Sequence, residues 1–309
     1  MASHLYWDAW FGIHPPAARK MYGQDFGRNP IGSGPFKLKE WVAGDHLTLE
    51  RYADYTWGAA FLKNKGPAYL DQIYFKFINE ESTIIAGLQS GDIDMAFLPN
   101  HFYDEFAADS QFQILTRPSG RLVALGWNTE RWPFTDLKTR QALMYGFDRE
   151  RFLQVMERGH GQVMYGAIVP ALPHYWPGEQ EMGPRFDPEK AKQLLREAGW
   201  QDTDGDGILE KDGKPFQVTL VAGGTEEYAR WSSLVQAQAK ELGIAVRIET
   251  LEQAALTARL NSGEYDLFRF IYDTVDPDIL AFFFYSEQVP AEGKSGLNYA
   301  RISDPQLDQ

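Results

Sequence analysis

Stretches of alternating apolar and polar residues and stretches of helical periodicity follow one another along the chain. Alternation and apolar runs predict strands in the first part of the chain at residues 36–41, 46–52, 70–78, 92–98 and 121–128. Apolar residues spaced at three and four predict helices at residues 82–91, 134–147, 148–159 and 187–199. The chain therefore mixes strands and helices from its beginning.

The clearest helix is predicted over residues 187–199. Asp187 can cap its first turn, Pro188 fits the first helical position, and Gly199 ends it. By the same reasoning we expect Asp148 to be the N-cap of the helix over residues 148–159. We expect Ser82 or Thr83 to be the N-cap of the helix over residues 82–91.

From residue 216 onward the pattern becomes regular. Strands are predicted at residues 216–223, 244–251 and 265–272, with helices at 225–243 and 252–263 between them. This β-α-β-α-β order predicts a parallel or mixed sheet covered by helices.

The length of 309 residues favours two lobes over one small domain. Residues 87–97 and 259–269 share the pattern Leu-x-Ser-Gly-acid-x-Asp-apolar. Two interpretations stay open. In the first, the pattern only ends a helix, with glycine as the C-cap, and leads into a strand. In the second, it marks two lobes of similar construction. The second interpretation puts the boundary near residues 117–120.

Charge and composition narrow the classes of function. The formal net charge is −13, which disfavours nucleic acid and anionic membranes as partners. Because the chain has no cysteine, disulfides, thiolate metal sites and cysteine nucleophiles are excluded. The first 16 residues lack the pattern of a signal peptide, and no apolar stretch approaches the ~20 residues that span a bilayer.

Catalytic motifs are missing from the sequence. Neither Gly-x-Ser-x-Gly nor His-Glu-x-x-His occurs, and the six histidines have no ligand-like spacing. Gly32 and Gly34 do not predict a phosphate cradle, because Pro35 lacks an N–H and a strand follows. Nothing in the sequence indicates an enzyme.

Residues 199–213 begin like a calcium loop. Asp202, Asp204 and Asp206 fall at every second position and Gly207 follows them, but Gly213 stands where the bidentate glutamate is needed. A strand also follows where an EF-hand has its second helix. We therefore expect an Asp/Gly hairpin, with a structural calcium ion at the three aspartates as the alternative.

Residues 268–287 combine a strand with carboxylates and aromatic residues. Asp273 and Asp276 follow the strand, which carries Arg269 and Tyr272. Carboxylates at the carboxyl end of a strand in an α/β lobe lie where ligands bind. The alternative is that Asp276 caps the next helix and the aromatic residues form core.

The ordered motifs of the chain resemble those of the extracellular solute-binding proteins of ABC transporters, family 5, the oligopeptide, dipeptide and nickel-binding type. The resemblance rests on segments that occur in the family's order: NPIGSGPFKLKEW, LTLERYADYTWG, LDQIYFKFI with GLQSGDIDMAFLP, GWNTERWPFTDLKTRQALMYGFDRE, DPEKAKQLLREAGWQDTDGDGILEKDGKPF, YDTVDPDILAFFF and GLNYARISDPQLD. Family members are longer at both ends, so we expect this chain to be an internal fragment.

The resemblance implies a periplasmic-binding-protein-like fold (type II, cluster C), an α/β architecture of two lobes with mixed sheets flanked by helices. Residues 1–118 would belong to the first lobe and 119–309 to the second, which is incomplete at its C-terminus. In peptide-binding members the aspartate at the position of Asp273 pairs with the ammonium of the ligand, and Arg269 is the candidate for its carboxylate. Tyr272, Trp127 and Trp176 are expected pocket walls.

The implied function is capture of a peptide or similar small solute outside the cell, for delivery to a membrane ABC permease. We expect a monomer that needs no cofactor. We expect it in the periplasm or outside the cell, where a lipoprotein anchor could hold it at the membrane. The segment before Asp273 is shorter than the family pattern and lacks its tryptophan, which leaves the ligand class open. An oligosaccharide is the alternative ligand, because the nine tryptophans of the chain offer flat rings that stack on sugar faces. A carboxylate-dependent hydrolase and a calcium-regulated module are the alternatives of other classes.

Overall fold

The computed structural model describes residues 14–117, 119–273, 278–291 and 293–308. The chain forms two compact units, Met1–Pro99 and Asn100–Gln309. The predicted division into lobes between residues 118 and 119 stays a prediction. No helix in the described ranges is long and apolar enough to cross a membrane.

The first unit contains a small antiparallel sheet in the order β1-β2-β3. Its strands are β1 (Phe36–Val42), β2 (His46–Arg51) and β3 (Gln72–Lys76). The turn between the first two strands places Gly44 at a φ of 77°, which glycine adopts without strain. The helical elements of this unit are α1 (Pro16–Tyr22), η2 (Gly23–Arg28) and α2 (Glu81–Ser90).

Two sequence predictions for the first unit are wrong. The N-cap of α2 is Glu80, because the helix begins one residue before Ser82. Residues 92–98 form no strand, and Met95 and Phe97 are 83% and 100% exposed. A strand needs a neighbouring strand to accept its backbone hydrogen bonds, whereas Ile93 donates its N–H to the carbonyl of Gly87 in the preceding helix.

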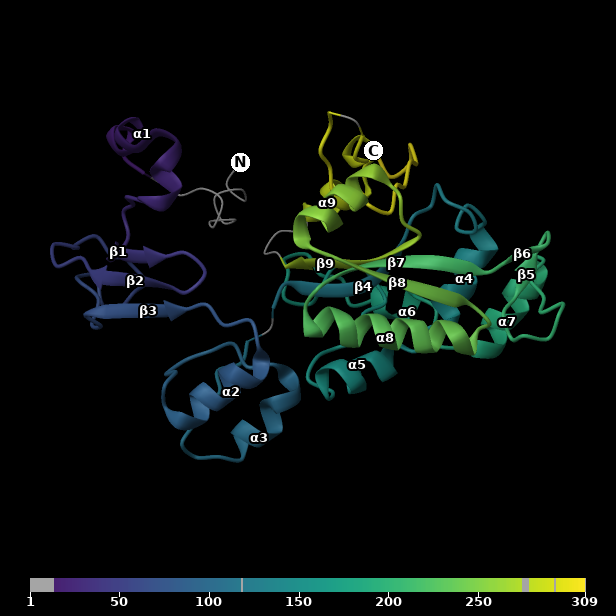
Figure 1. Cartoon of the computed structure of the whole chain (residues 1–309), viewed down its shortest axis with the longest axis horizontal. Coiled ribbons are helices and arrows are strands. Elements are labelled where there is room, and N and C mark those ends of the chain that lie inside the picture. The colour runs from purple at the N-terminus through teal and green to yellow at the C-terminus, as the bar shows by residue number, and fades with distance from the viewer. Residues whose placement is uncertain (1–13, 118, 274–277, 292, 309) are drawn as a thin grey trace. The chain divides into compact units, whose positions relative to one another are not determined.

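The second unit is built on a four-stranded mixed sheet in the order β4-β9-β7-β8. Figure 1 labels its four strands. Its strands are β4 (Arg121–Trp127), β7 (Gln217–Gly223), β8 (Ala245–Leu251) and β9 (Leu267–Asp273). Strand β7 pairs in parallel with β8 and β9, and β4 pairs antiparallel with β9. This confirms the mixed sheet that the alternation after residue 216 predicts.

Helices cover both faces of this sheet. Leu220 faces a core that includes Trp231 and Val235 of α8 (Glu226–Glu241). The next residue along the strand, Val221, faces Leu256 of α9 (Gln253–Ser262). Successive strand residues point to opposite faces, so β7 is buried on both sides and is apolar from Leu220 to Ala222.

Further helices complete the second unit. Buried side chains of α4 (Leu137–Gly146) and α7 (Pro188–Glu197) also pack in the core beside α8. The predicted caps Asp148 and Asp187 are confirmed, since their carboxylates accept from the N–H groups of Arg151 and Lys190. The remaining elements are η3 (Asn100–Phe102), α3 (Tyr103–Ala107), α5 (Arg149–Glu157), α6 (Glu179–Met182), β5 (Glu210–Lys211), β6 (Lys214–Pro215), α10 (Ile279–Phe284) and η4 (Ser286–Gln288).

Candidate functional site

The carboxyl ends of three strands meet at one edge of the second unit's sheet. The parallel strands β7, β8 and β9 end there at Gly223, Leu251 and Asp273. The antiparallel strand β4 begins at the same edge, where Arg121 pairs with Asp273. Ligands of open α/β sheets bind outside the carboxyl ends of the strands. We call this the carboxyl edge of the sheet.

Charged side chains gather at the carboxyl edge on the face that α8 covers. Arg269, Asp273 and Arg121 share this face because residues two apart along a strand, and residues paired across strands, point the same way. Helix α8 begins there with Thr225 as its N-cap and places Glu227 in its first turn. One oxygen of Glu227, Oε1, accepts from Nη2 of Arg121 at 3.0 Å and from Nη2 of Arg269.

The guanidinium of Arg269 is enclosed by α8. Its side chain is 3% exposed. Its Cζ lies 4.8 Å from the ring centroid of Tyr228 and 5.8 Å from that of Trp231. The Nε of Arg269 is buried and has no hydrogen-bond partner among the described residues. The structure therefore pairs Arg269 with Glu227 and leaves one of its donors unused.

The carboxylate of Glu227 stays ionised at this edge. Burial acts to raise its pKa, but the hydrogen bond and charge of Arg269, with the charges of Arg121 and Arg230, outweigh burial and lower the pKa. Sequence reasoning missed both Glu227 and Arg121. The signal for Glu227 was its position in the first helical turn after a strand that ends at the ligand-binding edge.

Asp273 is the last residue of β9 and is exposed to solvent. Its carboxylate makes no ion pair with another described residue. A carboxylate in this state can accept hydrogen bonds from an ammonium group, as the sequence predicts, and this role stays a prediction. The other predicted aspartate, Asp276, lies outside the described residues.

Tyr272 points to the opposite face of β9. It is 4% exposed, stacks on Phe283 with centroids 5.8 Å apart, and donates its hydroxyl hydrogen to the carbonyl of Ala167. Burial, with the nearby charge of Glu179, raises the pKa of Tyr272 to about 12. The phenol is therefore neutral and anchors the loop that contains Ala167.

The two predicted tryptophans lie in different environments. Trp127 ends β4 and pairs with Leu267, six residues along the strand from Arg121, or about 20 Å from the carboxyl edge. It packs on Phe134 with centroids 6.3 Å apart. Trp176 is 60% exposed in the loop before α6. The structure brings Arg269, Tyr272 and Asp273 to one strand end but does not bring Trp127 there.

The aspartate loop forms the expected hairpin. Strands β5 and β6 pair around Asp212 and Gly213, whose φ angles are 54° and 71°. The carboxylate of Asp202 accepts from the N–H groups of Gly205 and Gly207, which is how aspartates stabilise turns.

A fourth carboxylate joins the aspartates of this loop. Ligand oxygens of Asp202, Asp204, Asp206 and Glu210 all lie within 4.8 Å of one another. The side chain of Glu210 accepts from the N–H and the hydroxyl of Thr203. Glu210 does not stand at position twelve of a calcium loop, but its bridge to Gln201 folds it back beside the aspartates. A calcium ion at this loop stays a prediction.

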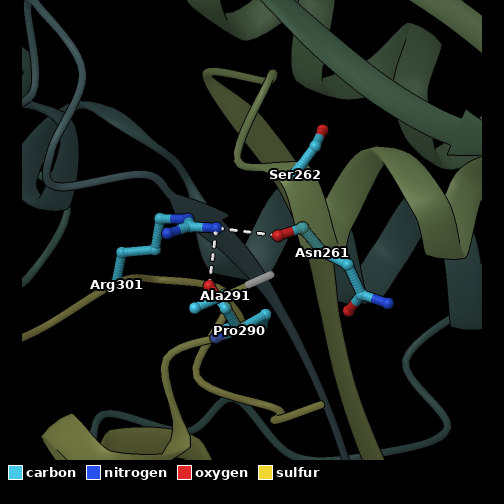
Figure 2. A pocket seen from close by; sticks show the side chains of 5 residues that line it. All are labelled: Asn261, Ser262, Pro290, Ala291 and Arg301. Atoms are coloured by element: carbon cyan, nitrogen blue, oxygen red, sulfur yellow. Dashed lines mark hydrogen bonds between the residues drawn. The ribbon is translucent and has the colours of Figure 1, made fainter. Parts of the chain in front are cut away.

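A surface depression lies at the other end of β9, between the end of α9 and the segment after η4. Its volume is about 500 Å³, and Asn261, Ser262, Pro290, Ala291 and Arg301 line it, as Figure 2 shows. Arg301 Nη2 donates to the carbonyls of Asn261 at 2.9 Å and Pro290 at 3.1 Å. The guanidinium thus ties two backbone segments together, which explains its burial without a ligand.

Comparison with known proteins gives a consistent picture. The family model described as "Bacterial extracellular solute-binding proteins, family 5 Middle" matches residues 6–290. The oligopeptide-binding protein AppA of Bacillus subtilis (strain 168) is 35% identical over 289 residues, which are 91% of this chain and 50% of AppA. The chain therefore spans about half the length of the curated relatives it matches.

Solved structures agree with the sequence matches. The structure of Bacillus subtilis AppA in complex with a nonapeptide superposes with a TM-score of 0.75 at 33% identity, covering 96% of this chain and 58% of that one. The structure of NikZ from Campylobacter jejuni in complex with Ni(L-His) gives 0.74 at 26% identity, covering 92% and 55%. Both confirm the periplasmic-binding-protein fold expected from the sequence.

Proposed function

Because this chain belongs to the bacterial extracellular solute-binding proteins of family 5, we propose that it is part of the substrate-binding component of an ABC import system. It captures a peptide outside the cell or in the periplasm and presents it to a membrane permease. The observation that carries the proposal is the 35% identity to an oligopeptide-binding protein over 91% of this chain. The proposed protein is a binding protein without catalytic activity, either free or held at the membrane by a lipid anchor.

The carboxyl edge supports a peptide as the solute. A peptide backbone offers an ammonium group at one end and a carboxylate at the other. Asp273 presents an exposed carboxylate with no ion pair among the described residues, which suits the ammonium group. Arg121, whose side chain is 41% exposed, lies on the same face and offers positive charge for the carboxylate of the peptide, with the buried Arg269 behind it at Glu227.

Calorimetric titration with a panel of solutes tests this proposal. The panel contains nonapeptides, oligosaccharides and the nickel complex of histidine, which is the solute in the NikZ structure. We expect heat of binding with peptides only. Binding of the oligosaccharides or of the nickel complex, without binding of any peptide, would contradict the proposal.

A further inference from the structure

One histidine of the first unit has a carboxylate at each of its two ring nitrogens. Nδ1 of His46 lies 2.7 Å from Oδ2 of Asp45, and Nε2 lies 3.4 Å from Oε2 of Glu40. The side chain of His46 is 14% exposed, whereas both carboxylates are mostly exposed. A neutral imidazole carries a hydrogen on only one nitrogen, so one carboxylate would then face a lone pair. The arrangement therefore suits the imidazolium form, in which both nitrogens donate.

A bulge in β1 brings Glu40 to the face of the sheet that carries His46. The register of β1 against β2 shifts after Leu38, so that Glu40 pairs with Thr48. In the unshifted register Glu40 would pair with Leu47 and would point to the face opposite His46. Re-aiming a side chain is a common effect of a bulge. The contact between Glu40 and His46 is therefore built into the backbone of the sheet.

Strand β3 also contacts this histidine. Tyr74 stacks on the ring of His46 with centroids 4.7 Å apart, and Lys76 is the Cα partner of His46 across the two strands. The face of a phenol ring attracts a cation, whereas the ammonium of Lys76 opposes one. The turn is tied to the same strand, because Phe77, the residue after β3, donates its N–H to the carbonyl of Asp45 at 2.8 Å. His46 thus lies where β1, the turn and β3 meet.

The charges around His46 favour its protonated form. The hydrogen bond to Asp45 does most to raise the pKa of His46, and the hydrogen bond to Glu40 and both carboxylate charges add to it. Burial of the ring acts to lower the pKa, but the two carboxylates outweigh burial. Because the pKa lies above its ordinary value of 6.5 in the folded chain, the stability from this cluster is fully present below pH 6.5. It is lost as the pH rises through the raised value.

The first unit has little core to hold its sheet together. Ala18 and Ile85 are the buried apolar side chains among its described residues, and both lie outside the three strands. An exposed ion pair contributes little by itself, but in a unit with so few buried side chains it is a larger share of the total. The protonation of His46 can therefore affect the stability of this sheet.

We propose that His46 is a pH-sensitive switch in the first unit. When protonated, it binds Glu40 of β1 and Asp45 of the turn and stacks on Tyr74 of β3. When neutral, it keeps one carboxylate and repels the other, so the turn between β1 and β2 loosens from β3 as the pH rises. The inference goes beyond the proposed function, because it concerns the first unit alone and does not depend on the solute.

Amide hydrogen exchange of the full chain, followed by NMR, tests the switch. The readout is the protection of the Phe77 amide, which is the exchange rate of an unstructured peptide at the same pH divided by the rate in the protein. We expect protection in the wild type to fall about two- to fivefold between about pH 5.5 and about pH 8, the size that exposed ion pairs allow. In H46Q we expect no such fall, because glutamine does not titrate. Protection that is independent of pH in the wild type, or that falls equally in H46Q, overturns the inference.

Three further variants separate the switch from a general loss of stability. Glu50 is exposed on the same face of β2, so E50Q should keep the full pH dependence, and its loss there would count against His46. E40Q and D45N each remove one carboxylate and should lower the pH at which the ring signals of His46 titrate in NMR spectra, D45N more than E40Q. An unchanged titration in both variants overturns the inference even where H46Q fails to fold.

Discussion

At the carboxyl edge, the fold determines how far each charged side chain is buried and with which residue it pairs. Arg269 is 3% exposed, whereas its partner Glu227 is 38% exposed. The pair joins residues 42 positions apart, from a strand and a helix. The sequence identified Arg269 and Asp273 because they share a strand. It did not identify Glu227, because only the packing of α8 on the sheet brings that residue to Arg269.

Replacing Glu227 tests this pairing. We expect E227Q to lower the free energy of unfolding by about 1–2 kcal/mol, because the buried guanidinium of Arg269 loses its counter-charge. The loss is limited to this size because Glu227 is partly exposed and water screens its charge. Urea unfolding followed by circular dichroism measures the change. E226Q, on the same helix, removes a mostly exposed pair with Arg230 and should cost less than about 0.5 kcal/mol. Equal effects of the two variants would refute the pairing.

The same pair makes stability depend on pH. The pKa of Glu227 is lower in the folded protein than its ordinary value of 4.5, so the folded state favours the ionised form. The stability it contributes is fully present above that value and is lost as the pH falls through the lowered pKa. The difference in unfolding free energy between wild type and E227Q should therefore be constant above about pH 5.5 and shrink below pH 4.5. A difference that grows toward acid pH would contradict this.

At the scale of elements, local signals predicted most of the second unit. Asp187 and Pro188 begin α7 as the sequence indicates, because capping is a matter of adjacent residues. The repeated Ser-Gly pattern ends both α2 and α9, with Gly91 and Gly263 at φ angles of 79° and 77°. Residues 92–98 failed as a strand because a strand depends on a partner elsewhere in the chain.

The hairpin after α7 gives a prediction at this scale. Gly207 has a φ angle of 88°, which a residue with a Cβ adopts only under strain. We expect G207A to destabilise the protein by about 1 kcal/mol, measured by urea unfolding. G224A is the matched control, because Gly224 is exposed and a Cβ there meets no atom within 4 Å. It should be neutral or slightly stabilising, and a larger loss than in G207A would count against the hairpin geometry.

At the scale of the whole molecule, the two units differ in how much core they contain. Among the described residues of the first unit, only Ala18 and Ile85 are buried apolar side chains. Large side chains such as Trp41, Trp57 and Phe61 are 39%, 51% and 88% exposed there. The second unit encloses a continuous core around Trp200, Phe216 and Leu220. Since burial of apolar surface drives folding, we expect the second unit to be the more stable one.

Limited proteolysis tests this difference in stability. Cleavage in the native state follows local opening, which is easiest where few apolar contacts must be broken. We expect a protease at low concentration to remove the first unit and leave a resistant fragment that begins near residue 100. Mass spectrometry identifies the fragment. Early cleavage between residues 121 and 273, with residues 14–99 intact, would contradict the difference in core.

The central claim is that the chain binds a peptide through Asp273 at the carboxyl edge. The most direct measurement is calorimetric titration of wild type and D273N with one nonapeptide, once with a free amino terminus and once acetylated. We predict that the wild type binds the free form at least about tenfold more tightly, and that D273N binds both forms equally and weakly. Equal binding of both forms by the wild type, or the same preference in D273N, would contradict the claim.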